Sequence, residues 1–181
     1  MIRKRNNGDS SVGKATVFVS HYWGNKITQL VTILRHHFSS FETEAERDPY
    51  LWIDLFSFNQ HITTNFNFFG SIEAIIANIN NTVMVFEAWN SPLPLTRAWC
   101  IWELYCTIDT NSKFTIAFGG EGEVGVEGGG LDEVLDSIKC EESQCEFERD
   151  RVRIYETILR SITFPKLNRL IKEVISSKIR Y

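Results

Sequence analysis

A tryptophan and a glutamate four positions apart, Trp99 and Glu103, are the residues whose spacing suggests chemistry most clearly. Residues 97–106 predict a helix, and at 100° per residue these two side chains lie one turn apart on the same side. The opposite face, which we expect to pack against a core, carries Ile101, Leu104, Tyr105 and Ile108. An indole beside a carboxylate suits a flat, cationic ligand that bears a sugar. The alternative is that Trp99 covers a neighbouring loop and Glu103 is solvated.

Length and composition limit the classes of protein to consider. The 181 residues suit one domain, and a hydrophobic content of 43% is enough for a core. A net charge of −4 without an extended basic stripe argues against a nucleic-acid partner. Residues 1–15 are polar and basic and lack the apolar region of a signal peptide, so we expect a flexible leader, a cytoplasmic location and no membrane partner.

The cysteines and histidines do not suggest a metal site. The four cysteines form no Cys-x-x-Cys pair, and the four histidines are not at ligand spacing. A disulfide between Cys140 and Cys145 is one alternative in an oxidising compartment. We expect four reduced thiols and no metal.

The order of apolar segments predicts an α/β fold. Short β-branched runs at 16–20, 50–54, 82–86 and 114–118 read as strands, and helical periods separate them. This alternation indicates a three-layer, flavodoxin-like parallel sheet of four to five strands with helices on both faces. A glycine-rich insertion at 119–130 and C-terminal helices at 150–180 complete a single domain over residues 16–181.

The strand ends indicate where a site would form. Ligands of parallel sheets bind beyond the carboxyl ends of the strands. The loops there are expected at 20–25, 55–69, 87–97 and 119–130, which brings Trp23, Asp54 and the Trp99–Glu103 pair to one rim. His21 ends the first strand and is either an acid–base group or a hydrogen-bonded structural residue.

Three segments, Thr16-Val17-Phe18-Val19-Ser20, Val83-Met84-Val85-Phe86 and Trp99-Cys100-Ile101-Trp102-Glu103-Leu104, carry a family resemblance. They resemble the first strand, the strand before the conserved box and the Trp-Cys-Leu-x-Glu-Leu box of plant-type domains of the Toll/interleukin receptor (TIR) superfamily, over roughly residues 15–118. Tyr50-Leu51-Trp52-Ile53-Asp54, followed by Asn59-Gln60, is similar to the signature of fungal heterokaryon-incompatibility domains, which are considered TIR-like. The chain looks like a divergent, TIR-like module.

The resemblance implies site residues. In catalytic TIR domains the box glutamate is needed for NAD⁺ cleavage, which implies that Glu103 is catalytic and that Trp99 contacts the ligand. Many TIR domains carry an arginine after the first strand, where this sequence has His21, Tyr22 and Trp23 instead. Arg97 is the substitute that we expect for that charge. The other substrate-binding candidates, all at the predicted rim, are Ser20, His21, Tyr22, Trp23 and Asp54.

Two classes of function follow. The first is an NAD⁺ hydrolase of an immune-type signalling system, which takes NAD⁺ as substrate, needs no cofactor and yields nicotinamide and linear or cyclic ADP-ribose. The second is a non-catalytic TIR-like module that acts by self-association through Phe66, Phe68 and Phe69. A third alternative is a piece of a larger immune- or death-type protein whose other parts carry the activity.

Overall fold

The computed structural model describes residues 12–57, 68–88, 92–119 and 130–179. Most of the predicted leader (1–11), most of the glycine-rich insertion (120–129) and Phe66 lie outside the described residues. The elements, in chain order, are β1 (Val17–Ser20), α1 (Ile27–Ser39), α2 (Glu44–Arg47), β2 (Leu51–Trp52), α3 (Asp54–Ser57), α4 (Phe68–Ile79), β3 (Asn81–Phe86), η1 (Leu93–Thr96), α5 (Ala98–Asp109), β4 (Lys113–Phe118), α6 (Gly130–Asp136), η2 (Cys140–Glu142), α7 (Glu148–Leu159) and α8 (Phe164–Ile179).

The predicted parallel sheet is confirmed. Its four strands are ordered β2-β1-β3-β4, and every pair of neighbours runs parallel. Strands β1 and β3 are central, and all four residues of β1 are buried, as expected for a strand covered on both faces. Asn80 and Asn111, with φ of 56° and 51°, adopt the left-handed conformation where helices give way to β3 and β4.

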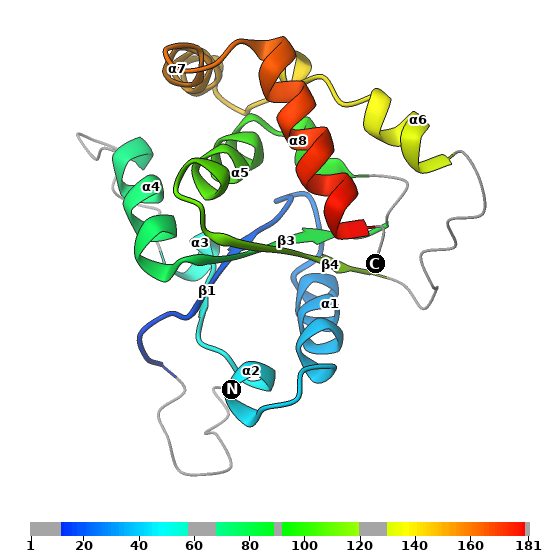
Figure 1. Cartoon of the computed structure of the whole chain (residues 1–181). Coiled ribbons are helices and arrows are strands. Elements are labelled where there is room, and N and C mark those ends of the chain that lie inside the picture. The colour runs from blue at the N-terminus through cyan, green and yellow to red at the C-terminus, as the bar shows by residue number, and fades with distance from the viewer. Residues whose placement is uncertain (1–11, 58–67, 89–91, 120–129, 180–181) are drawn as a thin grey trace.

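The helices form a layer on each face of the sheet (Figure 1). Along the central strands the side chains alternate between two buried clusters. Val17 and Val19 of β1 belong to the cluster under α1, whereas Phe18 belongs to the cluster under α4, α5 and α8. The connections after β1 and β3 therefore leave the sheet in opposite directions, α1 on one face and α5 on the other.

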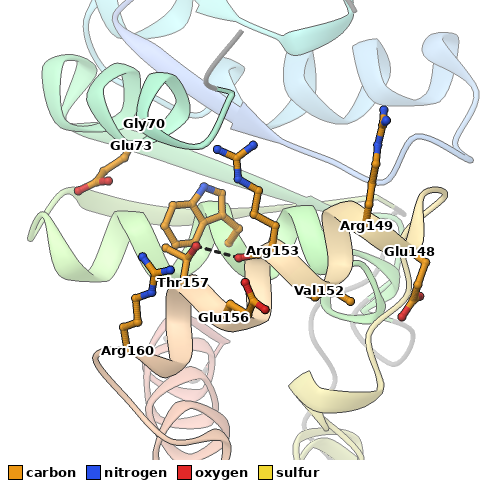
Figure 2. A pocket seen from close by; sticks show the side chains of 10 residues that line it. Gly70, Glu73, Glu148, Arg149, Val152, Arg153, Glu156, Thr157 and Arg160 are labelled. Atoms are coloured by element: carbon orange, nitrogen blue, oxygen red, sulfur yellow. Dashed lines mark hydrogen bonds between the residues drawn. The ribbon is translucent and has the colours of Figure 1, made fainter. Parts of the chain in front are cut away.

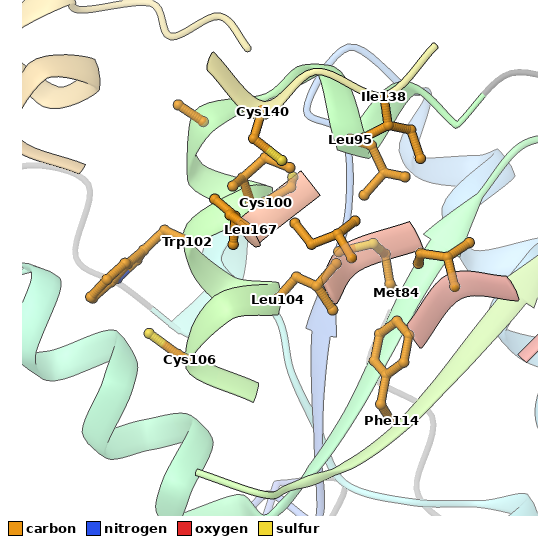
Figure 3. Packing of buried hydrophobic residues seen from close by; sticks show 14 of the residues in the cluster. Met84, Leu95, Cys100, Trp102, Leu104, Cys106, Phe114, Ile138, Cys140 and Leu167 are labelled. Atoms are coloured by element: carbon orange, nitrogen blue, oxygen red, sulfur yellow. The ribbon is translucent and has the colours of Figure 1, made fainter. Parts of the chain in front are cut away.

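The C-terminal extension completes the layer around α5, because α8 lies over β4 and α7 packs against α5 (Figure 1). Helices α7 and α8 bury Ile154, Ile158, Leu167 and Ile171 in the same cluster as α5. Figure 3 shows Leu104 of α5, Met84 of β3, Leu167 of α8 and Cys140 in this packing. As a result α5 is covered on several sides, and even Trp102 is only 3% exposed.

Several local predictions were wrong. The charged composition of the segment 42–49 predicts a loop, but the segment contains the short helix α2, which has a capping box between Thr43 and Glu46. Asp54, expected to end a strand, begins helix α3, so the long loop predicted at 55–69 is partly helical at both ends. The helical period puts Val31 on the buried stripe of α1 with Leu30 and Leu34, but Val31 is 37% exposed and Ile33 is buried.

No helix of the described ranges has both the length and the apolar character needed to cross a membrane.

Candidate functional site

A buried carboxyl group lies at the carboxyl end of the central strand β1. The hydroxyl of Ser20, the last residue of β1, donates to Oε2 of Glu103 at 2.6 Å. Ser20 is fully buried and Glu103 is 7% exposed. In a sheet of this order the connections diverge between β1 and β3, which is where ligands of doubly wound folds bind. The predicted convergence of the first strand end and Glu103 is therefore present.

Polar side chains also lie on either side of Glu103 along the sheet-facing side of α5. The Thr107 hydroxyl donates to the Glu103 carbonyl oxygen at 2.7 Å and lies 3.0 Å from the hydroxyl of Thr82 on β3. One turn earlier, the Cys100 thiol donates to the His21 carbonyl oxygen at 3.4 Å. Residues 100, 103 and 107 share one side of the helix, so α5 presents a polar stripe to the sheet.

Burial dominates the electrostatics of this stripe. Loss of solvent raises the pKa of Glu103 well above its ordinary value, and the negative charge of Asp54 raises it further. The hydrogen bond from Ser20 opposes this rise but is the smallest of the three influences. Burial and then the Glu103 charge likewise raise the pKa of the Cys100 thiol. Glu103 is therefore harder to ionise than an exposed carboxyl group, a perturbation that is typical of acids in functional sites.

A second carboxyl group, that of Asp54, lies at the end of β2 and gathers three donors. His21 Nε2 is 3.0 Å from Oδ1, the Trp23 indole N–H donates to Oδ2 at 2.5 Å, and the backbone N–H of Leu55 donates to Oδ1 at 2.8 Å. His21 is 6% exposed and Trp23 is 52% exposed. The imidazole therefore orients Asp54 from inside, while the indole covers it from the solvent side.

Arg97 supplies a cation at the same rim. Its guanidinium carbon lies 5.7 Å from the centre of the Tyr22 ring, within the range of a cation–π contact. The same ring lies so close to Gly24 that a Cβ at that position would collide with it. Glycine at this position is thus what lets the ring pack against the chain. The half-buried Arg97 precedes α5 directly, and Trp99 follows two residues later, packed against the core around α5.

The predicted orientation of the helix was wrong. The spacing placed Trp99 and Glu103 away from the packing face, but Glu103 is buried against β1, and Cys106 on the same side of the helix is 1% exposed. A helix with one packed face would expose the opposite side. Here the sheet covers one side and α7 and α8 cover another, so the polar stripe is the sheet-facing side. Neither alternative for Glu103, an open side chain beside Trp99 or a solvated one, describes its surroundings.

An open cleft lies elsewhere, between α4, α5 and α7 (Figure 2). It has a volume of about 730 Å³ and carries charges of both signs, with Glu73 on α4 facing Arg153, Glu156 and Arg160 of α7. Of the predicted site residues, none lines this cleft. Its walls therefore belong to the outer side of the helical layer, away from the carboxyl ends of the strands.

Metal ligation receives no support in the described part of the chain. No three His, Cys, Asp or Glu side chains there gather closely enough to hold a metal ion. All four cysteines are free thiols, and Cys100, Cys106 and Cys140 are buried. Burial raises the pKa of Cys140 to about 12, which keeps this thiol protonated and unreactive.

Two parts of the site escaped the sequence reasoning. Cys100 and Thr107 belong to the polar stripe, and their spacing of three and four residues from Glu103 was the available signal. The second part is the pairing of Arg97 with Gln144, which joins the start of α5 to the C-terminal extension. No local sequence pattern predicts a contact between two segments so far apart in the sequence.

Comparison with models of known protein families, with curated protein sequences and with solved structures finds no match to this chain.

Proposed function

We propose that the protein cleaves the bond between nicotinamide and ribose in NAD⁺, with the carboxyl group of Glu103 carrying the reaction. The observation behind the proposal is the buried Glu103–Ser20 pair at the point where the connections of the sheet diverge. The resemblance of residues 99–104 to the TIR box supports the same role for Glu103. Together they favour a TIR-like, immune-type signalling enzyme.

The chemistry fits a carboxyl group whose pKa burial has raised. The nicotinamide ring of NAD⁺ is cationic, so its arrival near Glu103 favours loss of the carboxyl proton. In the reaction the N-glycosidic bond breaks and its electron pair passes to the ring nitrogen, which becomes neutral. The ribose then carries oxocarbenium-like charge that a carboxylate stabilises. Water attacks the ribose carbon and releases a proton, which leaves nicotinamide and ADP-ribose.

The surrounding residues divide into ligand contacts and positioning groups. Arg97 is the cation available for the diphosphate, and the exposed Trp23 indole and the half-buried Trp99 are the flat surfaces for stacking. Ser20 is fully buried and bonded to Glu103, so it orients this carboxyl group, and His21 orients Asp54 in the same way. Because Glu103 is 7% exposed, the proposal requires the segment 21–25 to shift when the ribose enters.

The test is nicotinamide release from NAD⁺ by the purified protein and by its Glu103→Gln variant. Loss of a group that stabilises developing charge lowers kcat by roughly 100-fold or more. The matched control is Glu156→Gln, the same chemical change at an exposed carboxylate on α7. Assays should span a wide range of protein concentration, including crowded solutions that promote assembly. No release by the wild-type protein under any of these conditions, or equal release by the Glu103→Gln variant, contradicts the proposal.

A second candidate function, homotypic association, has its own observation. Exposed apolar side chains lie on the segment 23–31 and on α3, and the hydrogen bond between Trp23 and Asp54 links these two segments. Their exposed fractions are Trp23 52%, Ile27 42%, Val31 37%, Leu55 37% and Phe56 72%. Such a patch is typical of a protein-binding surface. The anchors suggested by the sequence cannot be compared with it, since Phe66 and the side chains of Phe68 and Phe69 lie outside the described residues.

Size measurements in solution test this second function. Phe56→Asp places a charge in the most exposed part of the patch and reduces any self-association. The control is Val152→Asp, which makes the same kind of change at a residue 45% exposed on α7. A monomeric wild-type protein, or an unchanged oligomer in the Phe56→Asp variant, counts against association through this surface.

A further inference from the structure

The helix that bears Glu103 begins without a capping side chain of its own. Its N-cap residue is Arg97, whose side chain makes no capping hydrogen bond, and its first turn contains no acidic residue. The first N–H groups of a helix need partners from outside the helix. The backbone N–H of Ala98 finds one in the C-terminal extension, where it donates to the carbonyl oxygen of Gln144 at 2.9 Å.

This contact is one half of a backbone bridge that encloses Arg97. The N–H of Gln144 donates to the carbonyl oxygen of Thr96 at 2.7 Å, so Arg97 and Gln144 pair in parallel as an isolated β-bridge. The peptide groups on both sides of Arg97 are therefore fixed by one residue of the extension. The direction in which the Arg97 side chain leaves the backbone depends on this bridge.

A single tyrosine of α7 holds the segment that supplies the bridge, residues 140–144. The Tyr155 hydroxyl lies 3.0, 3.1 and 2.8 Å from the carbonyl oxygens of Cys140, Glu141 and Ser143. It also lies 3.0 Å from the Ser143 hydroxyl. Cys140 and Ser143 are buried, so their carbonyl groups have little access to water as an alternative.

An asparagine of α8 holds the other side of the same segment. The backbone N–H of Cys140 donates to Oδ1 of Asn168 at 2.9 Å, and the Asn168 amide donates to Oε2 of Glu141 at 2.8 Å. Helices α7 and α8 thus both hold the 140–144 segment by hydrogen bonds. This segment is in turn hydrogen-bonded to the start of α5.

We propose that Tyr155 and Asn168 are positioning residues for ligand binding at Arg97, acting through the 140–144 segment. The inference rests on the proposed function, because it takes the ligand to be the diphosphate-bearing part of NAD⁺. An arginine contributes fully to such binding only when its guanidinium is held in place before the ligand arrives. The C-terminal extension is then part of the binding site's support, although neither residue reaches the ligand.

The experiment measures the Kd for ADP-ribose, a probe that carries the diphosphate and needs no turnover. Tyr155→Phe removes one hydroxyl, and we expect Kd to rise about tenfold, within the effect of one buried hydrogen bond, while kcat changes less than about twofold. In the Arg97→Gln background the same substitution should leave Kd unchanged, since residues that act through one another are not additive. Tyr105→Phe is the control, because it removes a hydroxyl from α5 itself, on a half-buried residue outside the bridge.

Amide hydrogen exchange provides the readout of the bridge. The N–H groups of Ala98 and Gln144 should exchange at least about tenfold faster in the Tyr155→Phe variant and at the wild-type rate in the Tyr105→Phe variant. Asn168→Leu is the second variant, to be used also if Tyr155→Phe does not fold, and should act in the same direction.

The outcomes separate this inference from the proposed function. ADP-ribose binding that depends on Tyr155 and Arg97, without any nicotinamide release, overturns the hydrolase and keeps the inference. Nicotinamide release with an ADP-ribose Kd that neither Tyr155→Phe nor Asn168→Leu alters overturns the inference and keeps the hydrolase. A wild-type protein that does not bind ADP-ribose, or equal losses with and without Arg97, also overturns the inference.

Discussion

The two faces of the sheet bury different kinds of side chain, although the same strands supply both. Under α1 the helix buries only apolar residues, which are Leu30, Ile33, Leu34 and Phe38. Under α5 the interface includes hydroxyl and carboxyl groups, which are Ser20, Thr82, Glu103 and Thr107. Apolar contacts need only shape to fit, whereas each buried polar group needs a partner as well.

This difference indicates that one face contains the groups that folding requires, whereas the other contains additional groups. A carboxyl group buried beside one serine hydroxyl stabilises the fold less than an apolar side chain of the same size. The α5 face therefore carries groups that folding alone does not require, at the place where ligands of such sheets bind. On α1 the fully buried residues are all apolar, and the polar group packed beside them is the half-buried His37 imidazole. Substitutions on the two faces should accordingly separate stability from activity.

The largest expected effect on stability comes from the α1 face. Leu30 is 2% exposed, and Leu30→Ala should lower the free energy of unfolding by about 2–5 kcal/mol, because it removes buried methyl groups and leaves a cavity. Urea denaturation measures the change. Nicotinamide release by the folded variant should match the wild type, so a specific loss of activity at full folding would break the separation between the faces.

The features of these two faces also differ in how well the sequence predicts them. The strands were predictable because β-branched runs such as 17–19 and 83–85 are buried on both sides and have no helical period. The rim was predictable because parallel strands end at one edge. This rule alone brought Ser20, Asp54 and Glu103 together, although Ser20 and Glu103 lie 83 positions apart.

The orientation of α5 was not predictable in the same way. A helical wheel of α5 has two sides that both become buried in the structure. Which of them meets the sheet depends on α7 and α8, which belong to the cluster that covers the rest of the helix. Short helices such as α2 depend on one capping contact, so an average over a window of residues misses them. The Arg97–Gln144 bridge forms only once the C-terminal extension has folded back.

A smaller effect on stability is expected from substitutions in the polar stripe, and its sign depends on which hydrogen-bond partners remain. Ser20→Ala leaves the buried Glu103 carboxyl without its donor and should lower the free energy of unfolding by about 1–3 kcal/mol. Ser20→Ala combined with Glu103→Leu replaces both partners by apolar groups and should restore wild-type stability or exceed it. Urea denaturation of both variants sharpens the comparison. A double variant less stable than Ser20→Ala alone would mean that the polar stripe is needed for folding.

The last effect is a pH dependence that appears only above the ordinary carboxyl pKa. Burial raises the pKa of Glu103 in the folded chain, whereas in the unfolded chain it stays near 4.5. Below that pH Glu103 is protonated in both states and contributes no pH dependence. As the pH rises past 4.5 the unfolded chain releases this proton while the folded chain keeps it, so the wild type loses stability until the pH passes the raised pKa. Glu103→Gln cannot titrate, so the difference in unfolding free energy between this variant and the wild type should shift in the variant's favour over that window.

Denaturation curves from pH 4 to pH 8 measure this shift, with Glu156→Gln as the exposed control. A constant difference across the range would show that Glu103 ionises as easily in the fold as in water, which would remove the electrostatic distinction between the two faces.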